Sequence, residues 1–151
     1  VAMDTLNDSC WALSNYEKNG LGTDTGEQYI RLYGFLQAII LQQDSISELH
    51  RLFIGNFKPV FDSAWARIRN VRNTTIGHPI EKKYGDKSNK NKIKRCHISY
   101  AALRPGFIQC IVWDKSTGKD EIVDIYINQL YNDYKIEAIT TLSKILRHIS
   151  V

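Results

Sequence analysis

The residues best suited to chemistry lie in one short stretch, Arg67 to Pro79, with the sequence RIRNVRNTTIGHP. Arg72 offers a planar fork of N–H donors, a geometry that matches the oxygens of a phosphate group. Histidine titrates near neutral pH, so His78 is suited to accepting or donating a proton. Asn73, next to Arg72, can both donate and accept hydrogen bonds. These three residues predict a site that binds phosphate and exchanges protons.

A helix must end between Arg72 and His78 if these side chains are to meet. In a continuous helix, residues 72 and 78 would point about 120° apart. Gly77 suits the end of a helix and Pro79 disfavours helical geometry at residue 78, so we expect the helix to stop at Gly77. His78 could then fold back toward Arg72. A purely structural interpretation stays open, in which Arg72 and His78 bind carbonyl groups at the helix end and Asn73 closes a turn.

The positive charge of the chain is concentrated just after this stretch. The formal net charge is +4, but Glu81 to Arg95 alone holds seven basic and two acidic residues, a local charge of +5. Such a segment can attract a polyanion such as RNA, although the same composition also fits a solvated loop. The predicted RNA-binding residues are Arg69, Lys82, Lys83, Lys87, Lys90 and Lys92.

The elements that must position these residues are mostly helical. Apolar residues recur at steps of three and four, which predicts helices over residues 3–18, 26–53 and 59–77 and a last helix capped by Asn132 or Asp133. β-branched and aromatic residues predict antiparallel strands at 96–102, 107–113 and 121–127, separated by turns. The predicted fold class is mainly α, a helical bundle with a three-stranded antiparallel β-meander (about 96–127) inserted before the last helix. We expect one domain over residues 1–151.

The apolar pattern also predicts a face for individual helices. Met3, Leu6, Cys10 and Leu13 describe one face of the first helix. The second helix is apolar around much of its girth, which is typical of a central bundle helix. The last helix is expected to carry five apolar residues on one side: Ile136, Ile139, Leu142, Leu146 and Ile149.

Composition narrows the class of protein further. No apolar run approaches the roughly 20 residues that cross a bilayer, and no basic-then-apolar leader opens the sequence. The three cysteines form no Cys-x-x-Cys pair, which favours reduced thiols in a cytoplasmic protein. The neighbours Cys96 and His97 lack a second pair at ligand spacing. We therefore expect no metal, no cofactor and no membrane association.

The order Arg72-Asn73, four residues, then His78 resembles the motif of the HEPN superfamily, an arginine and a polar residue followed by a histidine. HEPN domains are helical bundles that commonly dimerise, and the β-meander is extra to the family plan. Many are metal-independent endoribonucleases of toxin–antitoxin, abortive-infection and CRISPR systems. The resemblance implies a homodimer that cleaves RNA, with a cognate antitoxin or effector protein as a further partner.

The resemblance also implies roles for the three residues. The 2′-hydroxyl of the RNA would attack the adjacent phosphate, with His78 as general base or acid, Arg72 binding the phosphate and Asn73 orienting the histidine or a phosphate oxygen. HEPN toxins that are silenced by tyrosine modification often carry that tyrosine two residues after the histidine, where this chain has Ile80. The alternative is a non-catalytic HEPN module that dimerises or binds a nucleotide or a protein.

Overall fold

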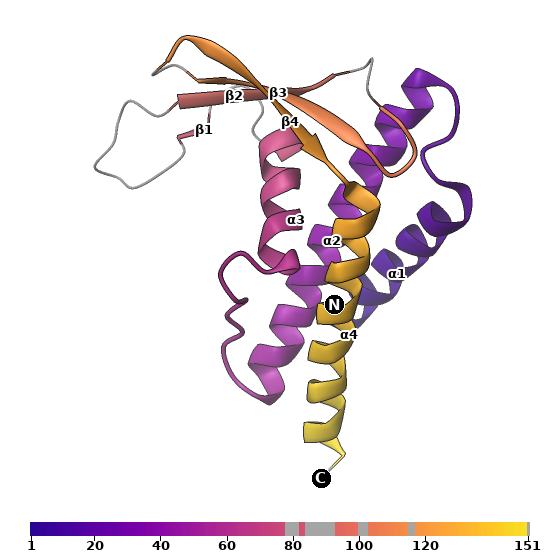
Figure 1. Ribbon diagram of the computed structural model, residues 1–151. Helices are drawn as coiled ribbons and strands as arrows, with labels where there is room; N and C mark the ends of the chain where they lie inside the picture. The colour runs from indigo at the N-terminus through magenta and orange to yellow at the C-terminus, as the bar shows by residue number, and fades with distance from the viewer. Residues whose placement is uncertain (78–81, 84–92, 100–102, 115–116, 151) are drawn as a thin grey trace. The chain divides into compact units, whose positions relative to one another are not determined.

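The computed structural model of the protein describes residues 1–77, 82–83, 93–99, 103–114 and 117–150. These residues form four α-helices and one antiparallel sheet that precedes the last helix in the sequence (Figure 1). The predicted class, mainly α with a meander before the last helix, is confirmed. The chain divides into two compact units, Val1–Arg69 with Gln129–Val151 and Asn70–Asn128. Both α3 (Ala64–Arg72) and α4 (Ile127–Ile149) contribute residues to each unit.

The first two helices have nearly the predicted bounds. α1 spans Ala2–Asn19 and α2 spans Thr25–Phe53. α2 begins where the Oδ1 atom of Asp24 accepts the N–H of Glu27 at 3.0 Å, an N-cap of the expected kind. Buried residues lie around much of the girth of α2, including the fully buried Leu32, Leu36 and Ile39. It is therefore the central helix of its unit, as its composition predicts.

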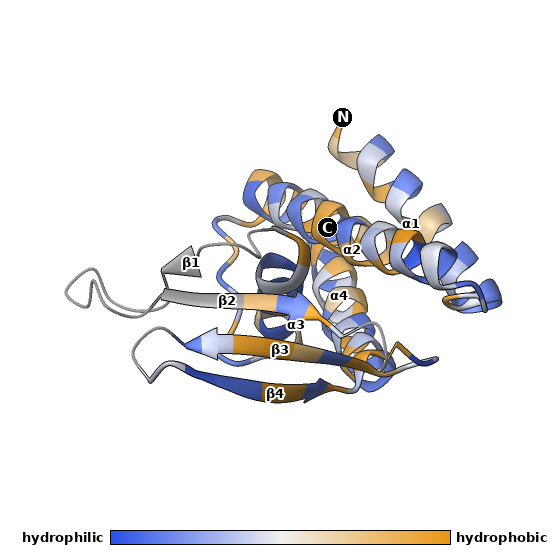
Figure 2. Ribbon diagram, turned by 90° about the horizontal axis from the view of Figure 1, so that it is seen from above, coloured by the Kyte–Doolittle hydropathy of each residue, from blue (hydrophilic) through white to orange (hydrophobic). Residues whose placement is uncertain are grey.

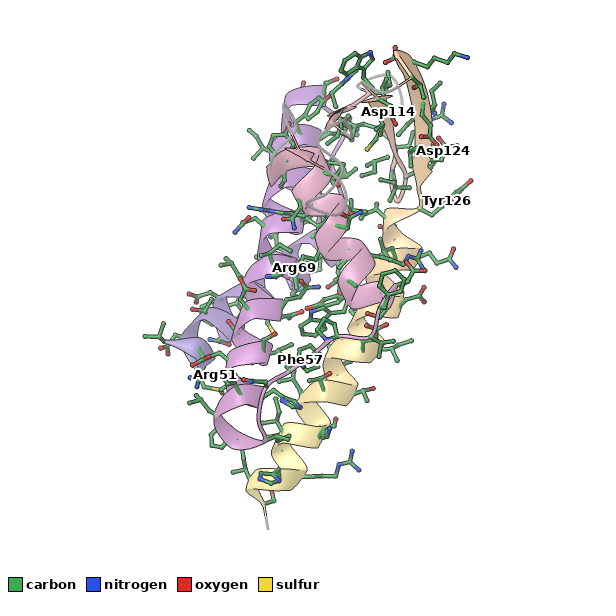
Figure 3. All side chains as sticks on the ribbon, turned by 90° about the vertical axis from the view of Figure 1, so that its left-hand side faces the viewer. Arg51, Phe57, Arg69, Asp114, Asp124 and Tyr126 are labelled. Carbon is green, nitrogen blue, oxygen red and sulfur yellow. The ribbon has the colours of Figure 1, made fainter. Side chains whose placement is uncertain are left out.

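A chain of ring contacts joins the helices of this first unit. Tyr16 of α1 stacks on Phe35 of α2, with ring centroids 3.8 Å apart. Tyr134 of α4 is buried, and its hydroxyl donates a hydrogen bond to Oε1 of Gln42 in α2 at 2.9 Å. Burial raises the pKa of Tyr134 above its ordinary value, which keeps this hydroxyl protonated as a donor. From Phe35 the ring contacts continue in this order: Tyr131, Tyr134, Trp65, Phe57 and His50. Phe57 is labelled in Figure 3.

The third helix begins later than predicted. Pro59 suits a first turn, but α3 starts at Ala64. The carboxylate of Glu137 in α4 accepts the N–H groups of Ala64 and Trp65, each at 2.9 Å, and the hydroxyl of Ser63 accepts the N–H of Ala66 at 3.3 Å. These acceptors satisfy the first free N–H groups of the helix. The start of α3 is thus set by a residue more than 70 positions away, which no local pattern reveals.

Two predicted helix faces are wrong in part. α1 buries Ser9, Leu13 and Tyr16, whereas Met3 and Cys10 are exposed. α4 begins at Ile127, five residues before the first candidate cap, and its buried residues are Ile127, Leu130, Tyr131, Tyr134, Ala138 and Ile145. The side of α4 with Ile136, Ile139, Leu146 and Ile149 is exposed instead. α4 is apolar on two sides, and the tyrosine contacts with α2 and α3 determine which side is buried.

The sheet is an antiparallel meander in the order β1-β2-β3-β4. Three strands were predicted, and their bounds are β2 (Ile93–Ile98), β3 (Ile108–Asp114) and β4 (Lys119–Ile125). A fourth, two-residue strand, β1 (Lys82–Lys83), pairs with β2 and was not predicted. Figure 2 shows the middle of β3 as apolar and much of β4 as hydrophilic. Alternate residues of β2 and β3 form the buried face of the sheet: Cys96, Ile98, Ile108, Cys110 and Val112.

The turn that leads into β3 depends on a glycine. Gly106 has φ +78°, and a Cβ atom there would lie 2.7 Å from the side-chain nitrogen of Asn128. Any other residue would strain the backbone and displace Asn128.

In the described part of the chain, none of the helices is long and apolar enough to span a bilayer.

Candidate functional site

Arg72 and Asn73 lie where the third helix changes its geometry. α3 ends at Arg72 and continues into a single π-helical turn, η1 (Asn73–Gly77). Such turns are rare in proteins and occur frequently at functional sites. Gly77 is the last described residue of this segment, so the predicted end of the helix stays a prediction. His78 is the next residue in the chain, and it lies outside the described residues.

The side chains of Arg72 and Asn73 are held together. Nη1 of Arg72 donates a hydrogen bond to Oδ1 of Asn73 at 3.1 Å, and both residues are half-buried. The bond orients the plane of the guanidinium group relative to the amide. Because the amide oxygen accepts from Arg72, the NH₂ group of Asn73 is oriented as a donor on the other side of the amide. The structure therefore brings together two of the three predicted catalytic residues.

Two threonines of the turn that follows bond back to the helix before it. The hydroxyl of Thr74 donates to the carbonyl of Asn70 at 2.7 Å, and that of Thr75 donates to the carbonyl of Val71 at 2.8 Å. Thr75 is buried, and β2 lies beside η1. In both bonds a side-chain hydroxyl donates to a backbone carbonyl, at the place where the backbone hydrogen bonds change from the α-helical to the π-helical pattern. Bonds of this kind often bend helices, and here they accompany the change from α-helical to π-helical geometry.

Arg69 has a partner that the sequence did not reveal. Its Nη1 atom donates to Oδ1 of Asp44 in α2 at 2.9 Å, and its Nη2 atom bonds to the same oxygen. Figure 3 shows the labelled Arg69 on α3 beside α2. Since the two residues are 25 positions apart, no spacing rule connects them. The carboxylate of Asp44 therefore balances the positive charge of Arg69, which was predicted from the sequence to bind RNA.

The predicted RNA-binding lysines are placed only in part. Lys82 and Lys83 form β1, opposite Lys94 and Ile93 of β2. Lys87, Lys90 and Lys92 lie outside the described residues. The two lysines Lys82 and Lys83 therefore form the edge strand of the sheet next to β2. The opposite edge strand, β4, carries exposed acidic residues at Asp120, Glu121 and Asp124.

Two buried thiols lie side by side in the sheet unit. Cys96 and Cys110 are hydrogen-bonded to each other, and all three cysteines of the chain are free, as predicted. The bond to Cys96, together with burial, raises the pKa of the Cys110 thiol, so it is a poor nucleophile. Among the described residues, no three His, Cys, Asp or Glu side chains gather as metal ligands would.

The chain was compared with models of protein families, with curated proteins and with solved structures. None of the three comparisons finds a match.

Proposed function

We propose that the protein is a metal-independent endoribonuclease of the HEPN type. One observation carries the proposal: Arg72 and Asn73 are hydrogen-bonded to each other where α3 passes into a π turn, and this turn ends one residue before His78. A phosphate-binding group, Arg72, and a proton-exchanging group, His78, thus lie six positions apart in the sequence, on either side of this turn. The helical context and the basic segment of residues 81–95 also agree with the proposal.

The proposed reaction is an internal transfer within the RNA. The 2′-hydroxyl loses its proton to a general base and attacks the adjacent phosphorus, while the 5′-oxygen leaves and takes a proton from a general acid. The products are a 2′,3′-cyclic phosphate and a 5′-hydroxyl. His78 is the proton-exchanging residue, and positioned histidines typically contribute about 10²- to 10⁴-fold to such steps.

Arg72 has the electrostatic role in this proposal. Charge accumulates on the phosphate oxygens as the 2′-oxygen attacks, and a prepositioned guanidinium stabilises that charge. The bond from Arg72 to Asn73 limits rotation of the guanidinium before RNA arrives. Asn73 in turn presents its NH₂ group to a phosphate oxygen or to the His78 ring. A role in a toxin–antitoxin or phage-defence system, with a protein that controls the enzyme, fits this activity.

Increasing salt should weaken RNA binding if the basic segment gathers RNA. Each phosphate contact made by a lysine releases counterions, so affinity falls steeply between about 50 and 200 mM salt. Changing Lys87, Lys90 and Lys92 together to glutamate should lower the affinity and flatten its salt dependence, while cleavage at saturating RNA survives. Fluorescence anisotropy of a labelled RNA across this salt range measures both quantities. An unchanged affinity would make the segment an ordinary solvated loop.

The active unit should be a homodimer with a shared site. One chain supplies one histidine at its motif, whereas the reaction needs a proton acceptor and a proton donor. A two-fold axis places the same patch of each chain opposite itself, so two copies of Arg72, Asn73 and His78 can line one groove. Mixed dimers with one His78→Ala chain should therefore lose most of the activity. Mixed dimers that retain half the activity of the wild type would show that each chain works alone.

A further inference from the structure

Two cysteines lie at neighbouring positions on the buried face of the sheet. In the antiparallel register, Cys96 of β2 lies opposite Val112 of β3. Cys110 precedes Val112 by two residues, so the two cysteines are diagonal neighbours on the same face, with exposed fractions of 4% and 2%. The residues directly opposite Cys110 are Ile98 of β2 and Val123 of β4. Each thiol therefore has apolar residues directly opposite it and the other thiol on the diagonal.

The hydrogen-bond pattern of the two strands brings this diagonal pair close together. The N–H of Ser99 donates to the carbonyl of Gln109 at 2.8 Å, so these two residues form a hydrogen-bonded pair of the ladder. Bonded and non-bonded pairs alternate along antiparallel strands, which places both cysteines in non-bonded pairs, where side chains approach more closely. The twist of the strands shortens one of the two diagonals. Since the thiols of Cys96 and Cys110 are hydrogen-bonded to each other, they occupy the short one.

The two thiols differ in reactivity. The hydrogen bond from Cys110 lowers the pKa of Cys96, against the opposing effect of burial. The same hydrogen bond and burial both raise the pKa of Cys110. Because the thiolate is the nucleophile, Cys96 is the thiol that reacts first with an oxidant. Once Cys96 has reacted it carries no thiolate, and the main cause of the raised pKa of Cys110 is gone.

We propose that Cys96 and Cys110 are a site of reversible oxidation, at which hydrogen peroxide converts the two thiols into one disulfide. The sulfur of Cys96 attacks one oxygen of the peroxide, the O–O bond breaks, and the products are a sulfenic acid and one water molecule. The sulfur of Cys110 then attacks the sulfur of Cys96, the S–O bond breaks, and hydroxide leaves as a second water molecule with the proton of Cys110. Two electrons pass from the thiols to the peroxide. A small oxidant is required because both sulfurs are buried.

The disulfide would join β2 to β3 and close residues 96–110 into a covalent ring. β2 lies beside η1, the turn that begins at Asn73, so the bond would tie the strand next to this turn to its neighbour in the sheet. Disulfides in reducing compartments are typically transient and serve catalysis or redox sensing. The proposal rests on the sheet alone and does not depend on the nuclease activity.

Mass spectrometry of the Cys10→Ser variant tests the bond. This change removes the exposed cysteine and leaves only the buried pair. The folded protein is treated with hydrogen peroxide, the reaction is stopped with catalase, and the chain is unfolded in urea and alkylated. Trypsin leaves both cysteines in one peptide, residues 96–115, because the Arg-Pro bond within it resists cleavage. That peptide should be lighter by two hydrogen atoms and carry no alkyl group, and dithiothreitol before alkylation should restore two alkylated cysteines.

The wild-type chain supplies the internal standard for this measurement, since Cys10 is exposed and open to the same oxidant. If peroxide oxidises Cys10 in full while the 96–115 peptide still takes up two alkyl groups, the buried pair is inert. That result would overturn the proposal.

Two further variants, each added to Cys10→Ser, test the order of the steps. In Cys110→Ala the sulfenic acid of Cys96 has no thiol to react with, so dimedone, which binds sulfenic acids, should label Cys96. In Cys96→Ala the thiol of Cys110 should stay unlabelled because burial keeps it protonated. With both cysteines present, dimedone should label neither, since the disulfide forms first. Labelling of Cys110 but not of Cys96 would overturn the assigned order, and the disulfide itself is measured without either alanine variant.

Discussion

Replacing His78 by alanine should lower the rate of RNA cleavage by at least about 100-fold, the lower end of what a positioned acid or base contributes. The proposal gives His78 both proton transfers, one in each copy of the dimer, so no other side chain can replace it. Single-turnover cleavage of an end-labelled RNA in excess EDTA measures the effect. RNA affinity, measured separately, should change little. His148→Ala is the matched control, since His148 is exposed near the end of α4, and it should retain full activity.

Arg72→Ala should have an effect of similar size, about 10²- to 10³-fold, the loss that follows removal of one donor to a developing negative charge. Arg72→Lys should remain impaired because a lysine keeps the charge without the fork that bonds to Asn73. Arg67→Ala is the control, an exposed arginine of the same helix. Urea unfolding of each variant checks that the fold is intact. Full activity in Arg72→Ala would contradict the role of Arg72.

The largest expected effect on stability is that of Trp65→Ala. The Trp65 ring is 3% exposed and contacts the rings of Phe57 and Tyr134. Its removal leaves a cavity where α3, α4 and the preceding loop meet. We expect a loss of about 3 to 5 kcal/mol in the free energy of unfolding. Urea denaturation at a fixed low protein concentration should show a lower midpoint with an unchanged slope.

Trp11→Ala is the matched control for this loss. Trp11 lies on α1 with an exposed fraction of 67%, and the same substitution there should change the free energy of unfolding by no more than about 0.5 kcal/mol. Equal losses in the two variants would mean that the ring contacts do not determine the stability of this unit.

Features encoded locally were predictable from the sequence. The bounds of α1 and α2 follow from the three- and four-residue spacing of apolar residues, which is a local pattern, and both are confirmed to within one residue. The meander followed from β-branched and aromatic residues, although strand bounds moved by one to four residues and β1 was missed. A two-residue strand such as Lys82–Lys83 has no pattern of its own and exists through its pairing with β2.

Features set by distant residues were not predictable. Glu137 determines where α3 begins, and Asp44 pairs with Arg69, but each acts across a long stretch of sequence. Which side of α4 is buried could not be predicted either, for the same reason. Its tyrosines and its isoleucines lie on different sides, and hydropathy favours the isoleucines. The tyrosines are buried because they have ring partners and, for Tyr134, a hydroxyl partner in Gln42.

The candidate site was predictable in part. The sequence placed Arg72 and Asn73 at the end of a helix, and the structure adds the hydrogen bond between them and the π turn that follows. In the π turn, Thr74 and Thr75 donate to carbonyls four residues back, a use of threonine that sequence spacing does not distinguish from that in an ordinary helix. The structure also shows that Arg72 is half-buried.

The most direct test of the nuclease proposal uses the wild-type protein and two substrates. One is an RNA oligonucleotide that the protein cuts, and the other is the same oligonucleotide with a single 2′-deoxy residue on the 5′ side of the cut. In excess EDTA, we expect the all-ribose strand to be cleaved to a 2′,3′-cyclic phosphate and a 5′-hydroxyl, and the deoxy strand to stay intact at that position. The absence of cleavage in EDTA, cutting beside the deoxy residue, or a 3′-hydroxyl product would contradict the proposal.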